Sequence, residues 1–582
     1  MSRLLSTFAV IWRLANPYFF SDDRWPARGL LAAVISIELS LVGINVLVNH
    51  WQNRFYNALQ DRNWEAFIGE LAFFFVLAIS YVFFAVYQLY LQQWLIIRWR
   101  TWMTRRYLDH WLADANHHRM QLLGDAADNP DQRIAEDIKL FIDRGIFIGL
   151  RVLGAIVSFI SFVVILWALS DSAPFRIFGY EIAVPGFLVW AALIYAIVGT
   201  LLTHWIGRPL IRLNFQLQRY EADFRYNLVR VRENSEQIAL LRGEPEEQTR
   251  LMERFSFVIA NWWAIMLRLK RLTLLTASYR EASIVFPYII VSPAYFAGRV
   301  QLGGLVQSAS AFESVREALS VFIDAYRELA EWRAVIARLD GFDAAIAQAQ
   351  AAATMGPAVT PTAGAANAIA FDGLQVHLPN GTPLVAADNV VFRSGDSVLV
   401  TGPSGAGKST LFRAIAGVWP FGSGAISVPP GASVVMLPQE PYFPIATLAA
   451  AVTYPAEPET FDRSRIKEII SAVGLPALAE RLDEEAHWNR ILSLGEQQRL
   501  AIARAILQAP DFLFVDEATA SLDEAAEEAL YRLVADRLRG ATVVSIGHRS
   551  TLRAHHGRHL ILDGTAAPRQ LREPKLEPVG RA

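Results

Sequence analysis

The chain has 582 residues, of which 53% are hydrophobic, and its 54 Lys and Arg nearly balance its 56 Asp and Glu. A formal net charge of −2 gives no sign of a polyanionic partner, so we expect no nucleic-acid binding, and zero cysteines exclude disulfides, thiol catalysis and thiolate metal sites. So high a hydrophobic fraction over so long a chain indicates a protein of the lipid bilayer.

The first half of the chain is predicted to be a helical membrane domain. Residues 1–14 lack the small-residue cleavage site of a signal peptide and predict an amphipathic helix at the membrane interface. Hydropathy then predicts five spans, and we add a polar sixth that carries Glu313, Arg316 and Glu317, because it keeps the count even and suits a channel-lining helix. The predicted spans are 29–48, 67–91, 146–169, 182–205, 282–297 and 305–323.

Basic residues predict the orientation of these spans. They gather between the second and third spans, at 98–144, and after the fourth, at 208–271. By the positive-inside rule both segments are cytoplasmic, as are both termini. Their length and helical periodicity, as at 220–242, predict that the membrane helices continue into the cytoplasm.

The composition changes after residue 344, which ends the predicted membrane domain, 1–344. Residues 345–368 are rich in Ala, Pro, Thr and Gly, carry no charge, and are predicted to form a linker. From 369 to 570 strands and helices alternate, which predicts an α/β domain, and 571–582 would be a C-terminal tail.

The α/β domain contains a phosphate-binding loop between a predicted strand at 397–401 and a predicted helix at 411–416. Glycines let the backbone N–H groups curl around an anion, and the helix N-terminus adds partial positive charge. Lys408 can reach the β- and γ-phosphates, and Ser409 can offer its hydroxyl to Mg²⁺. The residues predicted to bind nucleotide here are Gly402, Ser404, Gly405, Gly407, Lys408, Ser409 and Thr410.

A second motif is the apolar strand 512–516, which ends in the carboxylates Asp516 and Glu517. Alone, such a pair is often only a strand end at the surface. About a hundred residues beyond a phosphate loop, Asp516 is placed to hold Mg²⁺ and Glu517 to orient the attacking water or take its proton.

Four further features are unremarkable singly, and Ser493 with Gly495 would by itself be read as an ordinary helix N-cap. They are Gln439, Ser493-Leu494-Gly495, Ser521-Leu522-Asp523 and His548. In this order with the phosphate loop and Asp516-Glu517, they make residues 369–562 resemble the nucleotide-binding domain of ABC transporters.

This resemblance implies a P-loop fold with ATP and Mg²⁺ as cofactors. It implies that Gln439 senses Mg²⁺ and the membrane domain, and that His548 holds the γ-phosphate. Ser493 and Gly495 would contact the γ-phosphate bound to a second copy of the chain, with Asp523 at the dimer interface. The chain departs from the family pattern at Leu494, which replaces a glycine, and at His377-Leu378, where the family stacks an aromatic residue on adenine.

The membrane half has a narrower resemblance. Residues 129–137, 221–228 and 234–239 look like cytoplasmic-loop motifs of the peroxisomal fatty-acyl ABC transporters and of the bacterial SbmA/BacA peptide transporters. Residues 49–60 resemble an outer-loop motif of the bacterial group. We expect the charges after Asn129-Pro130 to dock on the nucleotide domain near Gln439.

The resemblance implies a homodimeric half-transporter that imports peptides, including antimicrobial ones, across the bacterial inner membrane. Cobalamin-like hydrophilic cargo and fatty acyl-CoA remain alternatives, and a non-transporting membrane ATPase acting as a sensor or assembly factor is the rival class. Six spans beside a full set of hydrolytic residues favour transport.

Carboxylates within the predicted spans raise a last question. Glu38 either bonds to a neighbouring helix or lines the pathway, and the apolar residues one turn away on its own helix favour the pathway. Together with Glu70, Glu313 and Glu317 it would give the cavity acidic character that attracts cationic cargo.

Overall fold

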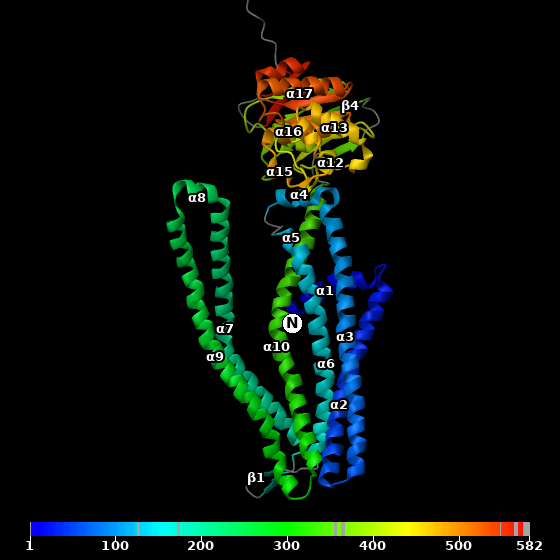
Figure 1. The fold of residues 1–582 in the computed structure, drawn as a ribbon, viewed down its shortest axis with the longest axis vertical. Helices are drawn as coiled ribbons and strands as arrows, with labels where there is room; N and C mark the ends of the chain where they lie inside the picture. Colours follow the sequence, from blue (N-terminus) through cyan, green and yellow to red (C-terminus); the bar gives the residue numbers. More distant parts are fainter. Residues whose placement is uncertain are drawn as a thin grey trace, which may run out of the picture. The chain divides into compact units, whose positions relative to one another are not determined.

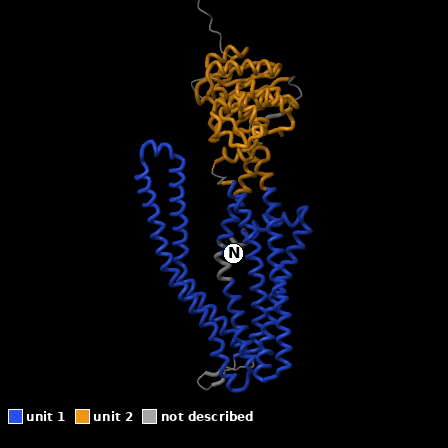
Figure 2. Tube along the Cα trace, viewed as in Figure 1, with its two compact units in different colours: residues 1–106, 131–340 blue, residues 107–130, 341–582 orange. Residues whose placement is uncertain are grey.

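The computed structural model describes residues 2–124, 129–171, 175–177, 180–182, 184–353, 358–361, 367–547, 549–563 and 568–573. The chain divides into two compact units, shown in blue and orange in Figure 2. The first, residues 1–106 and 131–340, is helical, and the second, residues 107–130 and 341–582, is built on a β-sheet. This division agrees with the expected helical membrane domain and α/β domain.

The first unit consists of long helices (Figure 1), the form in which apolar segments satisfy their backbone hydrogen bonds internally. Among the described residues, the segments 24–60, 64–122, 130–170 and 187–233 are long and apolar enough to cross a membrane. Its main helices are α1 (Ser2–Phe19), α2 (Arg24–Gln60), α3 (Trp64–Leu112), α6 (Ile138–Asp171), α7 (Phe187–Glu233), α8 (Ser235–Leu241), α9 (Glu244–Phe296) and α10 (Leu302–Ala353). A short hairpin, β1 (Phe175–Ile177) and β2 (Tyr180–Ile182), precedes α7.

The predicted spans fall on these helices with two differences at their ends. α7 begins at Phe187, after the expected 182, because β2 ends at Ile182 and Gly186 turns the chain with a φ of 67°. α10 runs to Ala353, nine residues into the expected linker, since its Ala- and Gln-rich end favours a helix. Of the remaining linker, 354–357 and 362–366 lie outside the described residues, as does the tail from 574.

Helices α7 and α9 are far longer than the roughly 20 residues that cross a bilayer, with 47 and 53 residues. They pack against each other, with aromatic contacts between Tyr220 and Phe257 and between Phe224 and Phe255, and α8 joins their ends (Figure 1). These lengths support the prediction that membrane helices extend beyond the bilayer, which stays a prediction.

The motif at 49–60 forms a polar contact between α2 and the start of α10. Asn49 donates from Nδ2 to the backbone oxygen of Gln307 at 3.1 Å, and Asn53 donates to its Oε1 at 2.6 Å. Asn57 accepts from the backbone N–H of Gly303 at 2.8 Å. A Cβ at Gly303 would collide with the Asn53 carbonyl, so glycine permits this approach. We call these five residues the amide ladder.

The charged part of the motif at 129–137, from Asp131 onward, lies in the first unit and has partners there. The carboxylate of Asp137 is buried and accepts hydrogen bonds from Arg133 Nη1 at 2.7 Å and from Arg338 Nε, on α10, at 2.9 Å. A buried carboxylate needs such partners. Arg133 and Asp137 are therefore paired within the first unit, and docking of the motif's charges near Gln439 stays a prediction.

A different part of the same loop contacts the nucleotide domain. Helix α4 (Asn116–Leu122) belongs to the second unit, where Arg119 donates from Nη2 to the backbone oxygen of Gly417 at 3.2 Å. Leu122 packs against the apolar core of the sheet. The contact lies just beyond the helix that follows the phosphate loop.

Glu38 has a polar partner on a neighbouring helix, the first of its two expected alternatives. Gln88, on α3, donates from Nε2 to its carboxylate. Gly154, on α6, lies so close that a Cβ there would collide with Glu38 Oε1. The sequence around Glu38 could not show a partner on another helix, and the contact favours the structural role.

Two of the remaining carboxylates expected to make the cavity acidic are also paired. Glu70 accepts from Arg54 Nε at 2.7 Å, and Glu313 accepts from Arg316 Nε at 2.9 Å and from Ser283 Oγ at 3.1 Å. Because neighbouring arginines neutralise them, the predicted acidic character is not supported.

The second unit is built on an eleven-stranded sheet of order β3-β8-β4-β5-β15-β14-β7-β13-β12-β9, with β6 beside β4. Strands β14, β7, β13, β12 and β9 are parallel, and their Val, Leu, Ile and Phe side chains form much of the core. Parallel strands end at one edge, so the loops after β7 and β12 meet there. The bounds are β3 (Ala358–Pro361), β4 (Ala368–His377), β5 (Pro383–Ala387), β6 (Val391–Arg393), β7 (Ser397–Thr401), β8 (Gly422–Val428), β9 (Val434–Leu437), β12 (Phe512–Asp516), β13 (Thr542–Ile546), β14 (Arg558–Asp563) and β15 (Arg569–Arg572).

Helices cover this sheet (Figure 1). The three that carry the candidate site are α11 (Lys408–Ile415), α16 (Leu494–Gln508) and α17 (Glu524–Arg537). The others are α12 (Leu448–Thr453), α13 (Arg463–Ala472), α14 (Pro476–Ala479) and α15 (Trp488–Ile491).

Candidate nucleotide-binding site

The phosphate loop connects β7 to α11 as expected. Gly402, Gly405 and Gly407 have φ values of 154°, 68° and 96°, a region that favours glycine. At Gly407 a Cβ would also lie 2.6 Å from Val385 Cγ2. Sterics and backbone conformation together therefore require glycine where the loop enters α11. Ser404 is exposed and Thr410 is half-buried.

Lys408 opens α11 and turns back over the loop. Its Nζ donates to the backbone oxygens of Gly402 at 3.0 Å and Pro403 at 3.1 Å. Burial lowers the pKa of Lys408, while the charges of Glu517 and Asp516 raise it. The ammonium is therefore held directly above the loop, where a phosphate can bind it.

Ser409, on α11, and Asp516, at the end of β12, come together at the edge of the sheet. Ser409 donates from Oγ to Asp516 Oδ1 at 2.9 Å. Burial raises the pKa of Asp516, and the hydrogen bond from Ser409 opposes that shift. Hydroxyl and carboxylate oxygens are ligands that Mg²⁺ prefers, particularly beside substrate phosphates. The pair therefore fits the metal that the phosphate loop predicts.

Glu517 follows β12 in a strained conformation. Its φ is 50°, and its backbone N–H donates to Ile546 at 3.2 Å. A non-glycine residue in this region costs on the order of 1 kcal/mol or more, and such strain concentrates at functional sites. The positive φ turns the backbone at Glu517, directly after Asp516 at the end of β12. The two carboxylates therefore start from different backbone conformations, which is compatible with different roles.

Ser493 and Asp523 are both helix N-caps in the single chain. Ser493 forms a capping box with Glu496, whose Oε2 accepts from the Ser493 N–H at 2.9 Å. Asp523 accepts from the N–H of Ala526 at 2.7 Å and caps α17. Ser493 and Asp523 remain exposed, so capping and a contact to a second chain are compatible. At Gly495 a Cβ would lie 3.3 Å from Leu522 Cδ2, which ties the start of α16 to the segment before Asp523.

Gln498 joins three of the motifs, and the sequence reasoning missed it. Its buried side chain donates from Nε2 to the backbone oxygen of Gln439 at 3.1 Å and accepts at Oε1 from the N–H of Ser521 at 3.1 Å. The available signal was a glutamine in a helix that, apart from Gln497 beside it, buries only Leu, Ile and Ala. The Gln439 side chain itself is exposed.

Two expected contributors cannot be placed as predicted. His548 lies outside the described residues, although Arg549 beside it donates to the backbone oxygens of Leu522 at 2.7 Å and Ala520 at 3.0 Å. His377 ends β4, and its backbone oxygen accepts from Trp419 Nε1 at 2.8 Å.

Comparison with known proteins identifies both halves of the chain. Residues 14–296 match the family described as ABC transporter transmembrane region 2, and residues 386–520 match the family described as ABC transporter. An uncharacterized ABC transporter ATP-binding protein of Haemophilus influenzae is 37% identical over 95% of this chain and 91% of its own length. The inner membrane ABC transporter ATP-binding protein YddA of Escherichia coli is 34% identical over 92% of this chain and 94% of its own length.

A solved structure, described as a bacterial Atm1-family ABC exporter with ATP bound, shares the fold. It superposes with a TM-score of 0.68 at 18% identity, covering 92% of this chain and 93% of that one. The expected fold class, a helical ABC exporter-type transmembrane domain with a cytoplasmic P-loop domain, is confirmed. The chain therefore belongs to the ABC transporters, as a half-transporter in which an SbmA/BacA-like membrane region is fused to one ATPase domain that couples ATP hydrolysis to transport.

Proposed function

We propose that this half-transporter works as a homodimer that imports peptides, including cationic antimicrobial ones, across the bacterial inner membrane. The observation that carries the cargo assignment is the motif at 49–60, which resembles the SbmA/BacA peptide transporters. In this chain that motif builds the amide ladder between α2 and α10. The name of the Escherichia coli relative supports the inner membrane, and the basic segments support a cytoplasmic ATPase domain with both termini on that side.

Hydrolysis is proposed to follow from the geometry of the phosphate loop and the edge of the sheet. ATP and Mg²⁺ are the family's cofactors, and bound Mg²⁺ neutralises charge that develops on the transferred phosphoryl group. Lys408 and the loop N–H groups would hold the phosphates, and Ser409 and Asp516, which are hydrogen-bonded to each other, would hold the metal. Glu517 accepts the proton of the attacking water or orients that water, and His548 holds the γ-phosphate.

The dimer is proposed because each chain carries one phosphate loop and one Ser493 motif. Ser493 and Gly495 would complete the site formed by Lys408 of a second copy, with Asp523 at the interface. Ser493 and Asp523 are exposed at the ends of their helices, as such contacts require. Gln498 links the backbone of Gln439 to that of Ser521, in the segment before Asp523. Through this link Gln439 would couple nucleotide binding to the membrane region.

The test is peptide sensitivity of cells that express the intact chain. Sensitivity to peptides with intracellular targets should rise, and Lys408→Ala should abolish the gain. Lys467→Ala, at a surface ion pair with Glu480, serves as the matched control and should retain it.

Three other outcomes would overturn parts of this proposal. If Lys408→Ala sensitises cells as strongly as the intact chain, ATP does not drive uptake. If sensitivity never changes but labelled cobalamin or fatty acyl-CoA accumulates, the cargo is wrong and the transporter assignment stands. If purified protein hydrolyses ATP in proteoliposomes and moves none of these compounds, a sensor or assembly role replaces peptide import.

A further inference from the structure

A cavity of about 350 Å³ lies between α7, α9 and α10 in the first unit. Among the described residues that line it, the charged ones are Arg280, on α9, and Arg316, on α10. An ionisable side chain among membrane helices is costly and marks a functional site. Two guanidinium groups on facing helices therefore suggest a bound anion.

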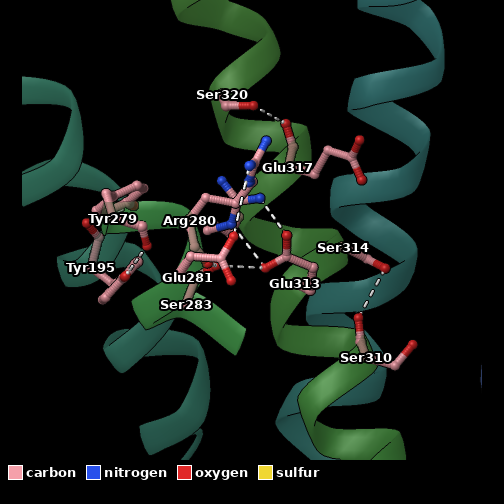
Figure 3. A network of polar contacts seen from close by, with 11 residues as sticks. Tyr195, Tyr279, Arg280, Glu281, Ser283, Ser310, Glu313, Ser314, Glu317 and Ser320 are labelled. Carbon is pink, nitrogen blue, oxygen red and sulfur yellow. Dashed lines mark hydrogen bonds and ion pairs between the residues drawn. The ribbon is translucent and has the colours of Figure 1, made fainter. Parts of the chain in front are cut away.

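One aromatic residue of the cavity lining, Tyr279, is held in place by Tyr195 (Figure 3). The rings of Tyr195 and Tyr279 stack with centroids 4.5 Å apart. Each hydroxyl donates to the other residue's backbone oxygen, at 2.6 Å from Tyr195 and 3.0 Å from Tyr279. A Cβ at Gly199, on α7, would collide with the Tyr279 ring, so glycine allows the ring to lie against α7. This part of the lining is flat, aromatic and fixed in place.

Arg316 is oriented by Glu313 before any ligand binds. Its Nε donates to Glu313 Oε2 at 2.9 Å, and one Nη donates to Oε1. Ser283 fixes the same carboxylate from α9 at 3.1 Å (Figure 3). Since a guanidinium carries five N–H donors, this pairing leaves others for the cavity. The Arg316 side chain is only 13% exposed, so its remaining donors have little access to solvent elsewhere.

Arg280 is far more accessible, with 67% of its side chain exposed. Its carboxylate neighbour, Glu281, is 3.7 Å away and equally exposed, so the pair is weak. The cavity also presents hydroxyl oxygens that can accept hydrogen bonds. Thr200 Oγ1 donates its own proton to the backbone oxygen of Ala196 at 2.6 Å, and Ser320 Oγ donates to the backbone oxygen of Glu317 at 2.8 Å. The lining thus offers guanidinium donors beside neutral acceptors.

We propose that this cavity binds the C-terminal carboxylate of a transported peptide through Arg280 and Arg316. The Thr200 and Ser320 oxygens accept from the last backbone N–H groups, and Tyr279 contacts the final side chain. The cavity volume suits the end of a peptide rather than a whole one. This inference rests on the proposed function, that peptides are the cargo, and adds which end of the peptide is recognised.

The test compares one labelled peptide as a free acid and as a C-terminal amide, transported by purified protein in proteoliposomes. Charge-assisted hydrogen bonds to guanidinium are strong, so the KM for the amide should be about tenfold higher than for the acid. Arg280→Gln should raise the KM of the acid severalfold towards that of the amide, since Arg316 remains, and leave the KM of the amide unchanged. Arg271→Gln, exposed on α9 and outside the cavity lining, should preserve the difference.

Each other outcome overturns the assignment. Equal KM values for acid and amide in the unaltered protein would show that peptides are carried without recognition of the C-terminus. The proposal of peptide import would then stand, and the assignment of this cavity would fall. An equal effect of Arg280→Gln on both forms would assign Arg280 to the general shape of the cavity. Transport of neither form by a protein that hydrolyses ATP would remove the proposed function together with this inference.

Discussion

The hydroxyl of Ser409 lies 2.9 Å from the Asp516 carboxylate, to which it donates a hydrogen bond across 107 residues of sequence. Ser409 lies in the helix after β7 and Asp516 ends β12, and these strands are separated in the sheet by β13 alone. Two candidate metal ligands are thus already in contact, so binding of Mg²⁺ with nucleotide requires little rearrangement of the protein.

Replacing Asp516 with Asn should separate stability from activity. Burial raises the pKa of Asp516, so the folded protein disfavours its ionised form and Asp516→Asn should raise the melting temperature of the nucleotide-free protein by a few degrees near pH 7.5. The gain should shrink as pH falls through that raised pKa, because the unaltered carboxyl then becomes neutral too. Hydrolysis should be lost. Calorimetry across a range of pH measures the melting temperature of both proteins. The control, Asp483→Asn at an exposed position, should show no gain. A lower melting temperature for Asp516→Asn than for the unaltered protein would contradict the prediction.

Glu517→Gln should abolish hydrolysis while ATP remains bound. Loss of a positioned base or water-orienting group typically lowers the rate by about 10²–10⁴-fold. Steady-state ATPase rates and equilibrium nucleotide binding measure the two effects separately. Glu524→Gln, exposed in the first turn of α17, should keep normal turnover. Near-normal hydrolysis by Glu517→Gln would show that another residue activates the water.

Ser493→Asp should distinguish helix capping from contact with ATP on a second chain. Aspartate is as good an N-cap as serine, so α16 should stay intact and the melting temperature nearly unchanged. Its negative charge would repel the γ-phosphate, so ATPase activity should fall by at least tenfold. If Ser493→Asp were fully active, Ser493 would have only the capping role seen in the single chain.

Gln498→Ala should weaken the link between the Gln439 and Ser521 segments. It leaves the backbone oxygen of Gln439 and the N–H of Ser521 without this partner, which typically costs about 1–3 kcal/mol. We expect faster amide hydrogen exchange at both segments and a reduced ATPase rate. Gln570→Ala, exposed on β15, should change neither quantity. Unchanged exchange in Gln498→Ala would show that the segments are held independently.

Glu38→Gln should leave transport close to normal, because a carboxamide can still bond with Gln88. Gln88→Leu should be the more damaging change, since it leaves Glu38 among helices without that donor. The yield of folded protein in detergent should fall for Gln88→Leu and not for Glu38→Gln. Loss of transport in a well-folded Glu38→Gln protein would show that the Glu38 carboxylate has a role in the transport pathway.

The sequence predicted features that depend on neighbouring residues. The phosphate loop could be located because glycines, Lys408 and Ser409 occur together between a strand and a helix. The role of Gln498 could not, because its partners lie 59 and 23 residues away and nothing near it indicates them. The pairing of Asp137 was missed for the same reason: its partner Arg338 is 201 residues distant. The pairing of Glu313 could have been predicted, because Arg316 lies only one helical turn away on the same helix.

The amide ladder constrains how the membrane helices can move. Because Gly303 is packed directly against the Asn53 carbonyl, sliding of α10 along α2 would drive side chains into that backbone. Sliding would also break several hydrogen bonds at once, in surroundings that offer few replacement partners. We therefore expect α2 and α10 to keep their register at the ladder and to move together during each transport cycle.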